Sequence, residues 1–127
     1  MLDTSAVSYA LRGVGEVGAA IRQRHPSQLC VSAITVTELR YGVEKRRSKK
    51  LATAVDAFIA GIAVEPFDAD AAGTYARIMI QLEASGQTIG TFDTMIAAHA
   101  LSLGITLVTH NAKHFKRVKG LLCDDWT

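Results

Sequence analysis

Three acidic residues in separate parts of the chain have surroundings that suit a metal-dependent nuclease. Asp3 lies in the segment MLDTS, Glu38 in TVTEL and Asp93 in GTFDT. Hard divalent cations such as Mg²⁺ prefer oxygen ligands, which clustered carboxylates supply. A metal ion held in this way activates water and neutralises charge on a phosphate that is being cleaved. Each motif is common by itself, so the prediction depends on the order of the three and on their neighbours.

Each carboxylate also has an interpretation without function. Asp3 follows two apolar residues, so it is either the N-cap of a helix starting near Ala6 or a carboxylate at the end of a strand. Glu38 lies nearly opposite the apolar stripe of its predicted helix, which indicates a solvent-facing side chain unless that polar face borders a crevice. Asp93 is in the first turn of an apolar helix, where the helix dipole alone favours a carboxylate.

Further polar residues are candidates for supporting roles. Asn111 follows the clearest strand and is either a weak ligand or water holder, or a turn residue. His110 and His114 are near the candidate site and are weak candidates for a general base. His99 lies on an apolar helical stripe, which favours a core histidine with a satisfied hydrogen bond over a metal ligand.

Alternating strand-like and helical patterns predict the elements that position these residues. We expect strands at 29–32, 62–67 and 105–109, a weak strand at 121–123, and another that ends at residue 3. Helical spacing covers 35–47, 51–62, 70–85 and 91–103, with Asp68 as a cap and Gly104 as a stop. This order predicts an α/β protein with a parallel sheet flanked by helices. The functional crevice of such sheets lies beyond the carboxyl ends of the strands.

Length and composition indicate one domain over residues 1–127 with a substantial core, since 49% of the residues are hydrophobic and 20% are charged. No apolar run is long enough to span a bilayer, and no secretory signal opens the chain, so we expect a cytoplasmic protein. Cys30 and Cys123 lie in apolar runs without metal-ligand spacing. They are predicted to be buried thiols.

Positive charge is concentrated in two clusters, although the net charge is only +2. Such clusters suit the phosphate backbone of a nucleic acid, but they also suit solvated helix ends, and the second also suits an acidic protein partner. The candidate RNA-binding residues are Lys45, Arg46, Arg47, Lys49 and Lys50 in the first cluster, and Lys113 and Lys116 in the second.

Taken together, the motifs resemble the PIN-domain toxin ribonucleases of VapC type over nearly the whole chain. The segment MLDTS is similar to the first acidic motif of that family, and SAITVTELRYG to the second. The third, IGTFDTMIAAHA, is the most specific, while LVTHN followed by Phe115 resembles the fourth. The closing Asp124-Asp125-Trp126 is also typical of the family.

The resemblance implies a PIN-like α/β/α sandwich with a central, mainly parallel sheet. It implies that Asp3, Glu38 and Asp93 bind Mg²⁺ or Mn²⁺ and hydrolyse RNA, including tRNA, with Glu38 binding the metal or orienting the attacking water. Thr4, Ser5, Thr91 and Asn111 would support these ligands. It further implies a toxin that forms a homodimer and a larger assembly with a VapB-type antitoxin, whose C-terminal segment occupies the toxin groove.

Three departures from the family pattern are visible. Asn111 stands where an acidic residue is frequent, so the number of metal ions in the site, one or two, stays open. Ser5 stands where Asn is frequent. Only Met1 and Leu2 precede Asp3, so either the first strand is short or the natural protein begins upstream. Two other functions stay open: a silent RNA- or protein-binding module, and a phosphoryl-transfer enzyme with Asp3 as nucleophile.

Overall fold

A parallel sheet of very short strands runs through the centre of the protein. In the computed structural model, which describes residues 1–127, β1 (Cys30–Ser32) pairs with β2 (Ala63–Glu65), and β3 (Leu107–Val108) pairs with β4 (Cys123–Asp124). Leu2 joins the two pairs through single parallel bridges to Val31 and Val108. The spatial order is therefore β2, β1, Leu2, β3, β4, with every pairing parallel.

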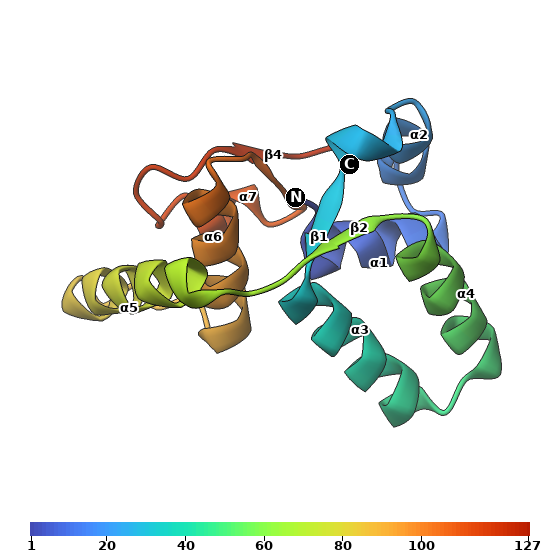
Figure 1. Cartoon of the computed structure of the whole chain (residues 1–127), viewed down its shortest axis with the longest axis horizontal. Helices are drawn as coiled ribbons and strands as arrows, with labels where there is room; N and C mark the ends of the chain where they lie inside the picture. The colour runs from blue at the N-terminus through green and yellow to red at the C-terminus, as the bar shows by residue number, and fades with distance from the viewer.

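Helices cover both faces of this sheet (Figure 1). One group is α1 (Thr4–Arg12), α2 (Val17–Arg22), α3 (Ala33–Arg46) and α4 (Lys49–Ala60), with the short 3₁₀ turn η1 (Pro26–Gln28) after α2. The other group is α5 (Ala69–Ala84), α6 (Thr91–Leu103) and the single-turn α7 (Ala112–Phe115). This arrangement is the predicted α/β/α sandwich.

Alternation of side chains along the strands divides the core into two layers. Met1 and Leu107 face a cluster built with α5, α6 and the buried Phe115 of α7. Their chain neighbours Leu2 and Val108 face the opposite cluster, which is built with α1, α2, α3 and α4. The β1 and β3 strands and the Met1–Leu2 segment thus contribute to both hydrophobic layers, and this fixes their register.

Local capping chemistry sets most helix boundaries. The Ser32 and Ser48 hydroxyls cap α3 and α4, and the Asp68 carboxylate caps α5 by accepting from the Ala71 N–H at 3.0 Å. Gly104 ends α6 at φ 66°, a left-handed conformation that favours glycine. The predicted roles of Asp68 and Gly104 are confirmed.

Other predictions were less accurate. The strands are shorter than expected, and helices α2 and α7 were not predicted, although the other helical segments are confirmed within three residues. Phe92 and Leu103, near the two ends of α6, are 48% and 43% exposed, because the buried residues of α6 are concentrated in its middle. Cys30 and Cys123 are free and only partly buried. None of the helices combines the length and apolarity needed to cross a membrane.

Candidate active site

Asp3 has both of the structural roles that the sequence left open, the end of a strand and the N-cap of a helix. Its backbone N–H donates to the Val108 carbonyl at 2.9 Å, which continues the pairing of Leu2 with β3. Its side chain is the N-cap of α1, because Oδ1 accepts from the Ala6 N–H at 2.8 Å. The same Oδ1 accepts from the Ser5 hydroxyl at 2.8 Å. Asp3 is therefore a buried carboxylate at a strand end and a helix cap at once.

Glu38 projects from α3 toward the start of α1. Its Oε1 accepts from the Thr4 hydroxyl at 2.6 Å, so the second carboxylate is tied to the residue that follows the first. The side chain is half-buried, and the polar face of α3 at this point borders α1. The expectation that this face is simply solvated is wrong.

Asp93 lies in the first turn of α6, where it contacts His114 of α7. His114 Nε2 is 3.2 Å from Asp93 Oδ2 and 3.0 Å from the Ile89 carbonyl oxygen. Because a carbonyl only accepts, Nε2 carries the hydrogen and points it at both oxygens. His114 thus holds the Asp93 carboxylate by hydrogen bonding. The sequence had indicated His114 only as a weak candidate for a general base.

The three carboxylates influence one another electrostatically. Burial is the main cause that raises the pKa of Asp3, Glu38 and Asp93. The charge of Asp93 raises the pKa of Asp3 further, and the charges of Asp93 and Asp3 do the same for Glu38. Hydrogen bonds from Ser5, Thr4 and His114 oppose these shifts. The site therefore concentrates negative charge that its own hydrogen bonds only partly offset.

The geometry brings the three carboxylates into one region, but it does not form a finished metal cage. No group of three or more His, Cys, Asp or Glu side chains stands close enough to share an ion. Glu38 is not on the far side of the molecule from Asp3, since Thr4 links it to the strand end. The carboxylates are therefore neighbours across the junction of α1, α3 and α6.

The predicted supporting residues divide into two pairs. The Thr4 hydroxyl donates to Glu38 and the Ser5 hydroxyl donates to Asp3. Thr91 is exposed at the start of α6, and no hydrogen bond joins it or Asn111 to the three carboxylates. Asn111 is the N-cap of α7, and its backbone N–H donates to the Thr109 hydroxyl at 2.9 Å.

Thr109 was not singled out from the sequence. It is buried at the end of β3, and its side chain favours the ionised form of Asp3. The available signal was a hydroxyl directly after the clearest strand, at the edge where a crevice is expected.

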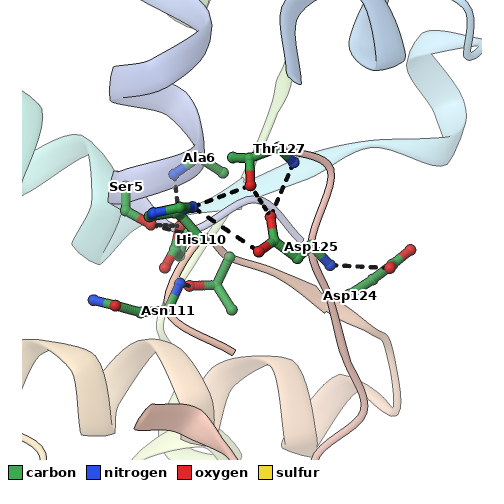
Figure 2. A network of polar contacts seen from close by, with 9 residues as sticks. Ser5, Ala6, His110, Asn111, Asp124, Asp125 and Thr127 are labelled. Carbon is green, nitrogen blue, oxygen red and sulfur yellow. Dashed lines mark hydrogen bonds and ion pairs between the residues drawn. The ribbon is translucent and has the colours of Figure 1, made fainter. Parts of the chain in front are cut away.

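A polar network runs from Ser5, whose hydroxyl donates to Asp3, to the last residues of the chain (Figure 2). The His110 N–H donates to Ser5 Oγ at 3.3 Å, and the His110 ring lies 3.1 Å from Thr127 Oγ1 and 3.9 Å from Asp125 Oδ2. Two hydrogen bonds from Thr127 lower the pKa of Asp125. These contacts place His110 beside Ser5, the residue whose hydroxyl donates to Asp3.

The basic residues are exposed, and the two clusters belong to different elements. Lys113 lies in α7, the helix that also carries His114, and Lys116 directly follows this helix. The first cluster covers the end of α3, the following turn and the start of α4. Arg46 of this cluster lines a hollow of about 240 Å³ with Thr4, Glu38 and Arg12. Sequence reasoning had not singled out Arg12.

Comparison with known proteins decides the family. The sequence matches the family described as PIN domain over residues 1–121. It is 37% identical to the tRNA(fMet)-specific endonuclease VapC of Shigella flexneri over 131 residues, which covers 100% of this chain and 97% of that protein. The chain belongs to the VapC-type family of PIN-domain ribonucleases. The predicted family is confirmed.

Solved VapC-type structures agree with this assignment. The VapBC2 complex of Rickettsia felis has a chain that superposes with a TM-score of 0.90 at 30% identity, covering 100% of this chain and 98% of that one. The corresponding values for VapBC of Salmonella typhimurium are 0.88 and 33%, with coverage of 100% and 97%. The predicted PIN-like fold is thereby confirmed.

Proposed function

We propose that this chain is the toxin of a VapB–VapC pair and hydrolyses RNA phosphodiester bonds with the help of Mg²⁺ or Mn²⁺ held by Asp3, Glu38 and Asp93. The observation that carries the proposal is the convergence of three half-buried or buried carboxylates from three separate elements. Their mutual repulsion and raised pKa values are costly for folding alone, but they suit a site completed by a cation.

The donor set fits a hard divalent ion. All three side chains offer carboxylate oxygens, the ligands that Mg²⁺ and Mn²⁺ prefer. Thr35 stands one helical turn before Glu38 on the same face of α3, and its buried Oγ1 has no hydrogen-bond partner. An unpaired hydroxyl at this position fits a shell of ordered ligands around an ion. When bound, the ion would polarise the scissile phosphate and lower the pKa of water.

The residues of the chain have distinct parts in this proposal. Asp3 is immobilised by the Ala6 N–H and Ser5, and Asp93 by His114, so both carboxylates are oriented before substrate arrives. Glu38, held by Thr4, would bind the ion or orient the attacking water. Thr91 and Asn111 remain proposed outer partners. The basic residues would hold the phosphates on either side of the cut.

Substrate and partner follow from the relatives. The Shigella relative is named for cleavage of tRNA(fMet), which makes a tRNA the first substrate to test. The solved relatives include complexes of VapB with VapC bound to DNA. We therefore include a VapB-type antitoxin as partner. A homodimer of this chain and a cytoplasmic location remain predictions from the sequence.

A cleavage assay tests the proposal directly. The antitoxin-free chain is incubated with tRNA and with an unrelated structured RNA, in Mg²⁺, in Mn²⁺ and in EDTA, beside Asp93→Asn. We expect cleavage that needs the ion and is lost in the variant. Undiminished cleavage in EDTA would remove the metal mechanism. RNA binding without cleavage would favour the silent module, and a trapped phosphoenzyme would favour Asp3 as nucleophile.

A further inference from the structure

We propose that His99 is a positioning residue, whose hydrogen bond with Ser32 fixes α6, which carries Asp93, against the start of α3, which carries Glu38. His99 Nδ1 lies 2.8 Å from Ser32 Oγ, between residues 67 positions apart in the chain. This inference rests on the proposed function, because it gives the bond a role in arranging two of the three carboxylates.

Both partners are fully inside the protein. Ser32 is 0% exposed and His99 is 1% exposed. Ser32 Oγ also accepts from the Ile34 N–H at 3.0 Å, which is the capping bond of α3. With that bond accepted, the one hydroxyl proton of Ser32 is free to be donated to His99 Nδ1. The hydroxyl thus donates its proton to a residue of α6 and accepts a hydrogen bond from a residue of α3.

The imidazole is built to stay neutral and in one orientation. Burial lowers the pKa of His99, although Asp68, Glu65 and a hydrogen bond with the Pro66 backbone oppose the shift. A neutral imidazole whose Nδ1 accepts from Ser32 carries its proton on Nε2. Phe67 packs against the ring edge-on, with 5.5 Å between centroids. The ring is therefore held by the Ser32 hydrogen bond and one aromatic contact.

The bond is placed symmetrically between the two carboxylates. Ser32 precedes Glu38 by six residues, and His99 follows Asp93 by six residues. At the rise of an α-helix, each carboxylate lies about 9 Å along its helix from the bond. The pair therefore does not touch the reacting groups and acts on them through the placement of two helices.

Packing alone does not explain a polar pair at this position. The surrounding residues of α6, including Ile96, Ala97, Ala98 and Ala100, are buried and apolar. An apolar contact would bury the same surface without desolvating an imidazole and a hydroxyl. A directional bond instead selects one rotation and one translation of α6 relative to α3. Such a choice matters most where the two helices must present charged groups to a common ion.

Three variants separate positioning from packing. His99→Phe keeps an aromatic ring and loses the bond, whereas His99→Asn places an amide near the position of Nδ1 and is the conservative rescue. Val17→Ala opens a cavity beside α2, away from the bond, and is the control for lost stability. If His99→Phe does not fold, Ser32→Ala and its conservative partner Ser32→Thr answer the same question.

The readouts are RNA cleavage and the Kd for Mn²⁺, measured by electron paramagnetic resonance on the RNA-free chain. For His99→Phe we expect kcat to fall by roughly tenfold and the Mn²⁺ Kd to rise severalfold, with an unchanged KM for RNA. His99→Asn should recover most of both losses, and Val17→Ala should change neither Kd nor kcat at a temperature where it is folded.

Failure of this inference is distinguishable from failure of the proposed function. Wild-type values of kcat and Mn²⁺ Kd in His99→Phe, with an active wild type and an inactive Asp93→Asn, would overturn the positioning role and leave the ribonuclease proposal standing. Losses of the same size in Val17→Ala would also overturn it. A wild-type chain that neither binds Mn²⁺ nor cleaves RNA would overturn both.

Discussion

Asp3 is expected to have two separable roles, and two substitutions at this position test both. Asp3→Asn keeps a side-chain oxygen that accepts from the Ala6 N–H and from Ser5. Asp3→Ala removes that acceptor. Both variants lose the same negative charge beside Asp93 and Glu38. Their difference in stability therefore reports the capping role, and their common loss of cleavage reports the carboxylate.

The contacts of Oδ1 set the size of the stability difference. Loss of an N-cap side chain costs about 1 kcal/mol. The Ser5 hydroxyl also loses its acceptor in this part-buried site, which adds about 1 kcal/mol. Asp3→Ala should therefore be less stable than Asp3→Asn by about 2 kcal/mol, a difference in Tm of roughly 6–8 °C for a chain of this size. The pairing of the Asp3 backbone with β3 is unaffected in both.

Thermal unfolding and cleavage measured on the same samples give the result. Both variants should lose at least about a hundredfold in kcat/KM, which corresponds to roughly 3 kcal/mol of transition-state stabilisation. Asp3→Asn should unfold no earlier than the metal-free wild type at neutral pH. Equal Tm values for the two variants would refute the capping argument, and near wild-type cleavage by Asp3→Asn would refute the catalytic one.

Three further predictions follow from the carboxylates and the basic residues. Burial raises the folded-state pKa of Asp93 above its ordinary 3.8. The metal-free protein therefore keeps its stability below pH 3.8 and loses stability as pH rises through the folded-state pKa. The stability gain of Asp93→Asn in urea denaturation should grow between pH 3 and pH 7, and an equal gain at both pH values would contradict the raised pKa. Thr4→Val removes the hydrogen bond to Glu38 and should lower kcat/KM by about tenfold or more, whereas Thr4→Ser should keep most activity; equal losses would remove the role of the hydroxyl. Replacing Lys113 and Lys116 together by Ala should flatten the salt dependence of RNA binding by inactive Asp93→Asn, lowering the log–log slope by about 1.5, and an unchanged slope would exclude these lysines from RNA contact.

The sequence was most informative where one local rule decides the structure. The spacing of apolar residues and the stop at Gly104 predicted α6 with its observed bounds, and Asp68 was predicted as the cap of α5. His99 was predicted as a satisfied core histidine, since an imidazole on an apolar stripe must find a partner. The identity of that partner, Ser32, depends on packing between elements and was not readable.

Contacts across the sheet account for most of what sequence reasoning missed. A helical wheel places Glu38 on a polar face, but it does not reveal that Leu2 brings α1 beside that face and so puts Thr4 in reach. His114 reaches Asp93 because Phe115 anchors the four-residue α7 in the core. Such a short helix leaves no periodic signal. The two interpretations of Asp3 were treated as alternatives, although a strand end that leads directly into a helix allows both.

This last point explains how a small domain tolerates three neighbouring carboxylates. Asp3 and Asp93 both stand at the start of a helix, where unpaired backbone N–H groups and the helix dipole favour negative charge. Glu38 lies further along α3 and depends instead on the Thr4 hydroxyl, which α1 presents directly after Asp3. The starts of α1 and α6 thus supply the first part of the charge compensation, and a cation is needed only for the remainder. A site arranged in this way can fold before its metal binds, and its three acidic residues need not be close in the sequence, because the packing of α1, α3 and α6 brings them to one junction.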